Sequence, residues 1–361
     1  MVKKLTQRER LARTVAGKAV DRPAVALWRH FYLAEVSREG LVEAMAGWQK
    51  THDWDFLKIN PRASYHVEDW GNRYESSGNE HIEPTLVRHR VREPDDFRRL
   101  DPLDVDGGSQ QACPVLSDHL QAVADLRRAV GRDVPMLMTA FTPMGIAAEL
   151  AGGPQDLAAL IAQDPASVHV GLQTITKTFA GFAARCVEAG ADGIFLATTH
   201  CATRTNFTAA QYAEFGRPYD LEILRAVRKA PLNLLHVCRP HSMVRDLADY
   251  PVAMLNWDTA DPSNPDLAAL APAVRPPGLA ACRARGPRRA CRARAAGRKA
   301  LVGGLNRKYF SETGGRETLL AEAEAARRAM GERPFVLGAT CTIDPTSDPD
   351  TVMAIRKSVG P

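Results

Sequence analysis

The fold is decided by the sequence LNLLHVC at residues 232–238, an apolar run that predicts a buried β-strand with reactive side chains at its carboxyl end. Side chains two residues apart on a strand point to the same face, so His236 and Cys238 are placed to bind one ion together. A lone His-x-Cys pair is also common in packed cores, because buried cysteine is frequent. The pair therefore needs support from the rest of the chain.

A third ligand candidate stands at the end of a second apolar run, PFVLGATC at residues 334–341. Cys341 closes this run, so it too sits where a strand gives way to a loop. Three protein ligands leave one tetrahedral position free for substrate, which is the pattern of a catalytic zinc site. We therefore predict zinc as cofactor, with His236, Cys238 and Cys341 as its ligands.

Short apolar runs alternate with helical patterns along the whole chain. Nearly continuous apolar strands are typical of a parallel sheet covered on both faces. The clearest helical pattern begins at Asp164-Pro165, an N-cap followed by proline in the first turn, and stops at Gly190. Eight strand and helix units predict an α/β protein, a single-domain (β/α)8 TIM barrel, over a doubly wound sheet. The runs are 24–28, 55–60, 134–140, 193–198, 232–238, 252–258, 300–305 and 334–341.

In barrel enzymes the catalytic residues lie at the carboxyl ends of the strands. In this sequence polar side chains follow nearly every apolar run. Asp258 is a catalytic candidate, either as a fourth oxygen ligand or by orienting His236, although it could equally cap the following loop. His200 and Cys201 are adjacent, so both cannot reach one ion from a regular strand, and core packing is the alternative. Arg29 is the second catalytic candidate. Candidates for substrate contact are Trp28, His30, Asn60, His200 and Trp257; the tryptophans suit a flat substrate or the core.

The composition limits the class of protein, its compartment and its partners. The chain has 361 residues, 45% of them apolar, enough for a large core. Seven cysteines without tight spacing indicate reduced thiols. The charged start and the absence of a run of about 18 apolar residues favour the cytoplasm and no membrane span. The net charge of +5 has a local source, because residues 275–299 hold nine Arg and Lys and no acidic residue. A nucleic-acid partner is therefore not expected.

We expect one domain over 1–361 with two departures from the barrel repeat. Residues 61–130 form a long insertion, expected to be a lid or a β-hairpin over the barrel mouth. Residues 274–299, rich in Arg, Ala, Pro and Cys, show no helical or strand period. They are expected to be a disordered surface loop, with a polyanion-binding arm or a frameshift artefact as the other interpretations.

Six short motifs resemble the uroporphyrinogen decarboxylase superfamily. They are ER at 9–10, DRP at 21–23, EFGRPYD at 214–220, LHVC at 235–238, NWD at 256–258 and GG at 303–304. The resemblance implies a single (β/α)8 barrel and one of two chemistries. These are cofactor-free decarboxylation of uroporphyrinogen, and zinc-dependent methyl transfer between corrinoid proteins and thiols.

The methyltransferase branch is the more similar. The decarboxylase branch carries an Arg-Gln-Ala-Gly-Arg loop after the first strand, where this chain reads WRHFY at 28–32 and keeps only Arg29. The decarboxylase's C-terminal histidine has no match, and Cys341 stands near its place. The methyltransferase zinc is held by a His-x-Cys pair and a distant Cys, matching His236, Cys238 and Cys341. Arg239 follows Cys238 where the family usually has Gly.

Three functions remain open. The first is a zinc-dependent methyltransferase, with a small-molecule thiol as acceptor and a corrinoid protein as possible partner. The second is a decarboxylase of uroporphyrinogen or a related acid, without cofactor, in which Arg29 and Asp258 bind the substrate. The third is a non-catalytic barrel that binds a tetrapyrrole or a corrinoid protein.

Overall fold

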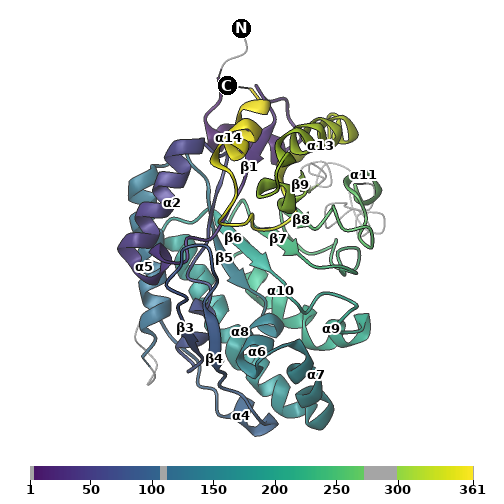
Figure 1. Cartoon of the computed structure of the whole chain (residues 1–361). Coiled ribbons are helices and arrows are strands. Elements are labelled where there is room, and N and C mark those ends of the chain that lie inside the picture. Colours follow the sequence, from purple (N-terminus) through teal and green to yellow (C-terminus); the bar gives the residue numbers. More distant parts are fainter. Residues whose placement is uncertain (1–3, 106–111, 272–298, 361) are drawn as a thin grey trace, which may run out of the picture.

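The computed structural model describes residues 4–105, 112–271 and 299–360 (Figure 1). Within them, eight parallel strands form one sheet in the order β1-β10-β9-β8-β7-β6-β5-β2. The backbone N–H of Asp55 donates to Val25 O across the two ends of this order, at 2.9 Å, so the sheet curls into a nearly closed (β/α)8 barrel. All eight predicted runs are strands: β1 Ala24–Ala26, β2 Leu57–Ile59, β5 Met136–Phe141, β6 Gly193–Ala197, β7 Leu234–Val237, β8 Met254–Trp257, β9 Ala300–Leu305 and β10 Phe335–Ala339.

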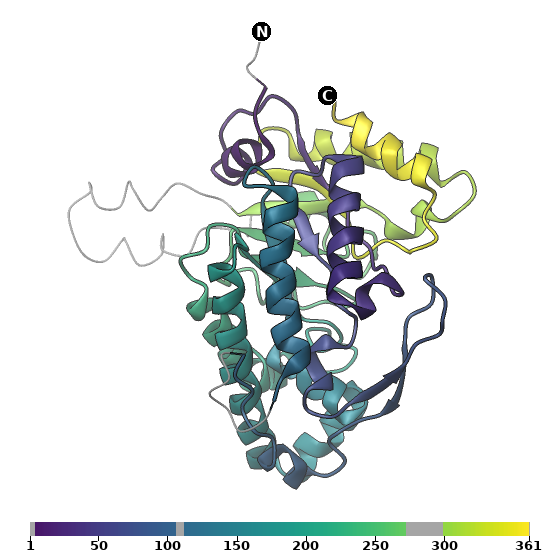
Figure 2. The ribbon, with the colours of Figure 1, turned by 90° about the vertical axis from the view of Figure 1, so that its left-hand side faces the viewer.

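Helices surround this sheet, and α2 and α5 lie side by side on one flank (Figure 2). Asp164 caps the longest one, α8, by accepting from Ala166 N and Ser167 N, as predicted. Pro218 lies in the first turn of α10, and Gly216 separates that helix from α9. The longer helices are α1 Gln7–Val15, α2 Arg38–His52, α5 Pro114–Val130, α6 Pro143–Ala151, α7 Pro154–Gln163, α8 Pro165–Glu188, α10 Arg217–Ala226, α13 Gly315–Met330 and α14 Pro349–Ser358. Shorter ones are η1 Ala34–Val36, α3 Tyr65–Glu68, α4 Pro94–Arg98, α9 Ala209–Phe215, α11 Leu267–Leu270 and η3 Arg307–Phe310.

The insertion at 61–130 contains the expected β-hairpin. Its strands, β3 Arg73–Glu75 and β4 Thr85–Arg88, pair antiparallel and project from the barrel body (Figure 2). Tyr74 binds Glu149 of α6, and the charges of Glu80 and Glu83 act on Arg29 and Tyr32 after β1. The hairpin therefore runs along the carboxyl-end side of the barrel. The insertion also contains α3 and α4, which the sequence patterns did not predict, because helices of four or five residues carry too little periodicity.

Two further expectations concern the chain as a whole. The Arg-rich segment predicted at 274–299 lies, except for Lys299, outside the described residues. No helix in the described parts of the chain is both long and apolar enough to cross a lipid bilayer.

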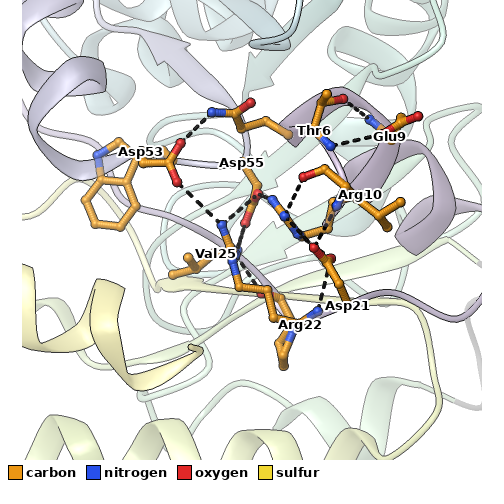
Figure 3. A network of polar contacts seen from close by, with 12 residues as sticks. Thr6, Glu9, Arg10, Asp21, Arg22, Val25, Asp53 and Asp55 are labelled. Atoms are coloured by element: carbon orange, nitrogen blue, oxygen red, sulfur yellow. Dashed lines mark hydrogen bonds and ion pairs between the residues drawn. The ribbon is translucent and has the colours of Figure 1, made fainter. Parts of the chain in front are cut away.

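A buried ion-pair network joins the first elements of the chain at the amino-terminal end of the barrel (Figure 3). The fully buried Asp55 carboxylate, just before β2, binds Arg10 of α1 at 2.6 Å and Arg22 at 2.6 Å. It also accepts from the backbone N–H of Val25 in β1 at 2.7 Å. Arg10 donates further to Asp21, and this lowers the pKa of the Asp21 carboxyl. One carboxylate thus ties α1, β1 and β2 together.

We predict that Asp55→Asn lowers the free energy of unfolding by about 3–5 kcal/mol, because the buried Arg22 loses its close carboxylate partner and Arg10 keeps only Asp21. Urea unfolding followed by circular dichroism measures this. The control is Glu324→Gln, which breaks an exposed ion pair with Arg328 and should cost less than about 1 kcal/mol. Equal losses in the two variants would contradict the role assigned to Asp55.

Candidate metal centre

His236 in β7 is held in one tautomer by its neighbour in β8. The Nδ2 group of Asn256 donates to Val302 O at 2.9 Å and Ala339 O at 3.1 Å, so its Oδ1 must be the atom that faces His236. That oxygen lies 2.5 Å from His236 Nδ1, which therefore carries the proton. The lone pair of Nε2 faces the Cys341 sulfur, 3.5 Å away. This arrangement is typical of a metal-binding histidine oriented by a hydrogen bond to its other ring nitrogen.

Cys341 brings the distant end of the chain to this imidazole. Its sulfur lies 3.5 Å from His236 Nε2, and the Cys238 thiol is a second neighbour. The neighbouring Cys238 lowers the pKa of Cys341, and Cys341 in turn raises the pKa of Cys238. The Cys238 sulfur lies 3.2 Å from Thr199 O as well. The three predicted ligands are thus brought together through Cys341.

The donor atoms do not form a ready-made coordination shell. Among the residues described, no group of three or more His, Cys, Asp or Glu side chains has the geometry of a metal site. The chemistry of the donor set nevertheless fits zinc, since one imidazole nitrogen and two sulfurs converge and the nitrogen's tautomer is set. Zinc ligation by these residues remains a prediction.

The backbone around Cys238 is strained. Thr199, Arg239 and His241 all have positive φ, at 49°, 82° and 52°, although none is glycine. Such conformations cost of order 1–3 kcal/mol each and concentrate at functional sites. Arg239 has a φ of 82°, in the region that glycine adopts without steric cost. Local backbone stability alone therefore does not account for the conformation of the turn after β7.

Two more predicted residues lie near the cluster and one lies apart from it. Asp258 is half-buried, and burial together with the Cys341 charge raises the pKa of its carboxyl. It accepts from Ala260 N at 3.2 Å, which is the capping role considered for it. Burial and then the Arg239 charge lower the pKa of His200, whose Nε2 lies 2.9 Å from Arg239. Cys201 points away and is fully buried against Met144 O, as expected for its adjacent position.

The remaining candidates divide between the mouth and the core. Arg29 lies half-buried after β1, with its guanidinium over the Phe31 ring, and His30 binds the buried Glu35 at 3.0 Å. Trp28 is buried with its ring 5.4 Å from Phe195. Trp257 is fully buried and its indole N–H donates to Pro265 O, so the structure places this side chain in the core.

The sequence analysis missed Lys58, a charged side chain inside the barrel. It lies in β2 and is only 6% exposed, and burial lowers the pKa of its ammonium to about 7. Its Nζ donates to Asn60 Oδ1 at 3.0 Å and lies 4.8 Å above the Phe195 ring. The sequence carries a signal for it, because a lysine inside an apolar run is unusual. A cavity of about 400 Å³ at the opposite end, lined by Gly17, Arg327 and Phe335 among others, contains no comparable group of reactive side chains.

Comparison with known families decides the assignment. The model of the family described as uroporphyrinogen decarboxylase (URO-D) matches residues 71–360. The chain belongs to the URO-D family. No curated protein sequence matches this URO-D family chain.

Solved structures share its fold. A methyltransferase from Methanosarcina mazei is 19% identical, with a TM-score of 0.69 and 98% of each chain covered. A B12-independent methionine synthase from Shewanella sp. W3-18-1, in complex with selenomethionine, is 12% identical, with a TM-score of 0.55 and coverage of 93% of this chain and 94% of that one. A putative vitamin-B12-independent methionine synthase from Listeria monocytogenes is 13% identical, with a TM-score of 0.52 and coverage of 89% and 85%.

The buried ammonium predicts a pH dependence of stability in this URO-D family protein. The pKa of Lys58 is about 7 when folded and near 10.4 when unfolded, so the unfolded state binds more protons between these values. The free energy of unfolding should therefore gain up to about 1.4 kcal/mol per pH unit from this group as pH rises from 7 to 10. Lys58→Met should remove that gain. Urea unfolding at several pH values tests it, and the same slope in wild type and variant would contradict it.

Proposed function

We propose that this URO-D family protein is a zinc-dependent methyltransferase that transfers a methyl group from a corrinoid or similar donor to a thiol. The observation that carries the proposal is the convergence of His236 Nε2 and the Cys341 and Cys238 sulfurs at the carboxyl ends of β7 and β10. Two thiols and a neutral imidazole are a donor set suited to zinc. The fold that this chain shares with a methyltransferase also supports the proposal of methyl transfer.

The residues of the chain perform defined tasks in this proposal. Asn256 keeps the proton of His236 on Nδ1, so the lone pair of Nε2 faces the site. Cys341 is the thiol that loses its proton more readily, because its neighbours Cys238 and His236 lower its pKa. Asp258 lies close enough for the Cys341 charge to affect it, and we assign it to an exchangeable ligand position or to orienting the substrate. Bound zinc would lower the pKa of a substrate thiol, so that the nucleophilic thiolate exists at neutral pH.

The name of the family favours a second candidate, decarboxylation of uroporphyrinogen or a related acid. In that reaction Arg29 and Asp258 would bind the substrate and no cofactor would be needed. Arg29 is a single half-buried arginine, and its guanidinium has the charges of Glu80 and Asp344 nearby. These carboxylates disfavour a polyanionic tetrapyrrole at this place, because like charges repel.

We predict about one zinc per chain in the purified protein, measured by inductively coupled plasma mass spectrometry. His236→Ala, Cys238→Ser and Cys341→Ser should each lose most of that metal and the transfer of a methyl group from methylcobalamin to a thiol. Cys186→Ala is the control, because Cys186 is buried in α8 and should leave both unchanged. A folded, metal-free wild type that releases carbon dioxide from uroporphyrinogen would establish the second candidate instead.

Asn256→Ala should weaken zinc binding about 10- to 100-fold, because His236 loses the group that fixes its tautomer. Competition with a chelating dye measures the affinity. Asn233→Ala is the control: Asn233 stands at the other end of the β7 run and donates to Val227 O at 3.0 Å, so its loss affects stability but not the ligands. If both variants bind zinc equally, Asn256 has no orienting role.

A further inference from the structure

Lys58 and Asn60 present unused hydrogen-bond donors inside the barrel. Asn60 follows β2 and has no exposed surface. Its Oδ1 accepts a hydrogen bond from Lys58 Nζ. Its Nδ2 group has no partner among the described residues. A buried amide donor without a partner costs about 1–3 kcal/mol, so its retention calls for an explanation.

The ammonium of Lys58 is also short of a counter-charge. Its contacts within the described residues are the neutral Asn60 oxygen and the face of Phe195, and neither is a carboxylate. The charges of Cys341 and Glu35 act on it from farther away. Because isolating a cation in the interior is costly, a buried lysine of this kind is expected to meet an anion. Two adjacent donors, one of them charged, match the two oxygens and single charge of a carboxylate.

The pair lies close to the thiol cluster. The Phe195 ring centroid is 4.8 Å from Lys58 Nζ and 5.2 Å from the His236 ring centroid, so the ammonium and the imidazole are at most about 10 Å apart. A molecule that spans the two must therefore be short. The distance suits an acid with a few carbon atoms and excludes a tetrapyrrole held at both points.

We propose that Lys58 and Asn60 bind the carboxylate of a short thiol-bearing acid, whose sulfur reaches the cluster of His236, Cys238 and Cys341. The carboxylate end of this proposal stands on Lys58 and Asn60 alone, and the thiol end rests on the proposed function. Lys58 is then a specificity-determining residue, since it distinguishes acidic thiols from neutral ones.

The test is isothermal titration calorimetry of the full-length protein with three probes. These are 3-mercaptopropionate, the neutral 3-mercapto-1-propanol, and propionate, which lacks the thiol. Wild type should bind 3-mercaptopropionate most tightly. Lys58→Met should weaken binding of 3-mercaptopropionate at least tenfold and leave 3-mercapto-1-propanol unchanged. The control Lys50→Met alters an exposed lysine of α2 and should change neither.

Asn60→Asp is a second variant that does not depend on losing the ammonium. It places a carboxylate beside Lys58, so it should raise the melting temperature and abolish binding of 3-mercaptopropionate by occupying the ammonium. This result also covers the case in which Lys58→Met fails to fold. Tight binding of 3-mercaptopropionate to Asn60→Asp would overturn the proposal.

The two proposals fail in different ways. If 3-mercaptopropionate does not bind wild type, or if Lys58→Met weakens acid and alcohol equally, the carboxylate site is wrong, whatever the zinc content. If the protein holds no zinc and 3-mercapto-1-propanol does not bind, the proposed function is wrong. Lys58-dependent binding of 3-mercaptopropionate and propionate would then still support the carboxylate site.

Discussion

One buried carboxylate bridges the two ends of the barrel sheet. Asp55 joins Arg10, Arg22 and the backbone of β1 at the amino-terminal end of the sheet, where the first and last strands of the sheet order meet. β7 and β10 are not neighbours in the sheet, so their carboxyl ends face one another only because the sheet curls round. The ladder through β8 and β9 joins these two strands, and its curvature brings the Cys341 sulfur to 3.5 Å from His236 Nε2.

Several features at the carboxyl end of the barrel lower the stability of the folded state. Three non-glycine residues have positive φ there, an ammonium is buried without a carboxylate partner, and an amide donor is left unsatisfied. Each of these features costs free energy, and the large apolar core and the Asp55 network offset the cost elsewhere. Local destabilisation gathered at one end of a well-packed barrel is typical of a site selected for chemistry.

Polar residues of the site act on one another across strands that are far apart in sequence. Asn256 in β8 orients His236 in β7, and the Cys341 charge acts on Lys58 in β2 and on Asp258 after β8. Phe195 in β6 lies between Lys58 and His236 and contacts both. The thiol cluster and the Lys58 pair therefore belong to one interior, with an apolar ring between a region suited to a metal and a region suited to an anion.

The sequence by itself determined the eight strands, the barrel and the cap of α8, because apolar periodicity and Asp-Pro caps act over a few residues. It also placed His236 and Cys238 on one face of a strand. Only the tertiary structure decided that Cys341 meets them, that Asn256 selects the tautomer, that Trp257 belongs to the core and that Lys58 points into the barrel. These facts depend on which strands lie across the barrel from one another, and strand pairing and curvature arise from contacts between residues far apart in sequence, such as Ala24 of β1 and Val336 of β10, or Cys341 and His236, which are 105 positions apart.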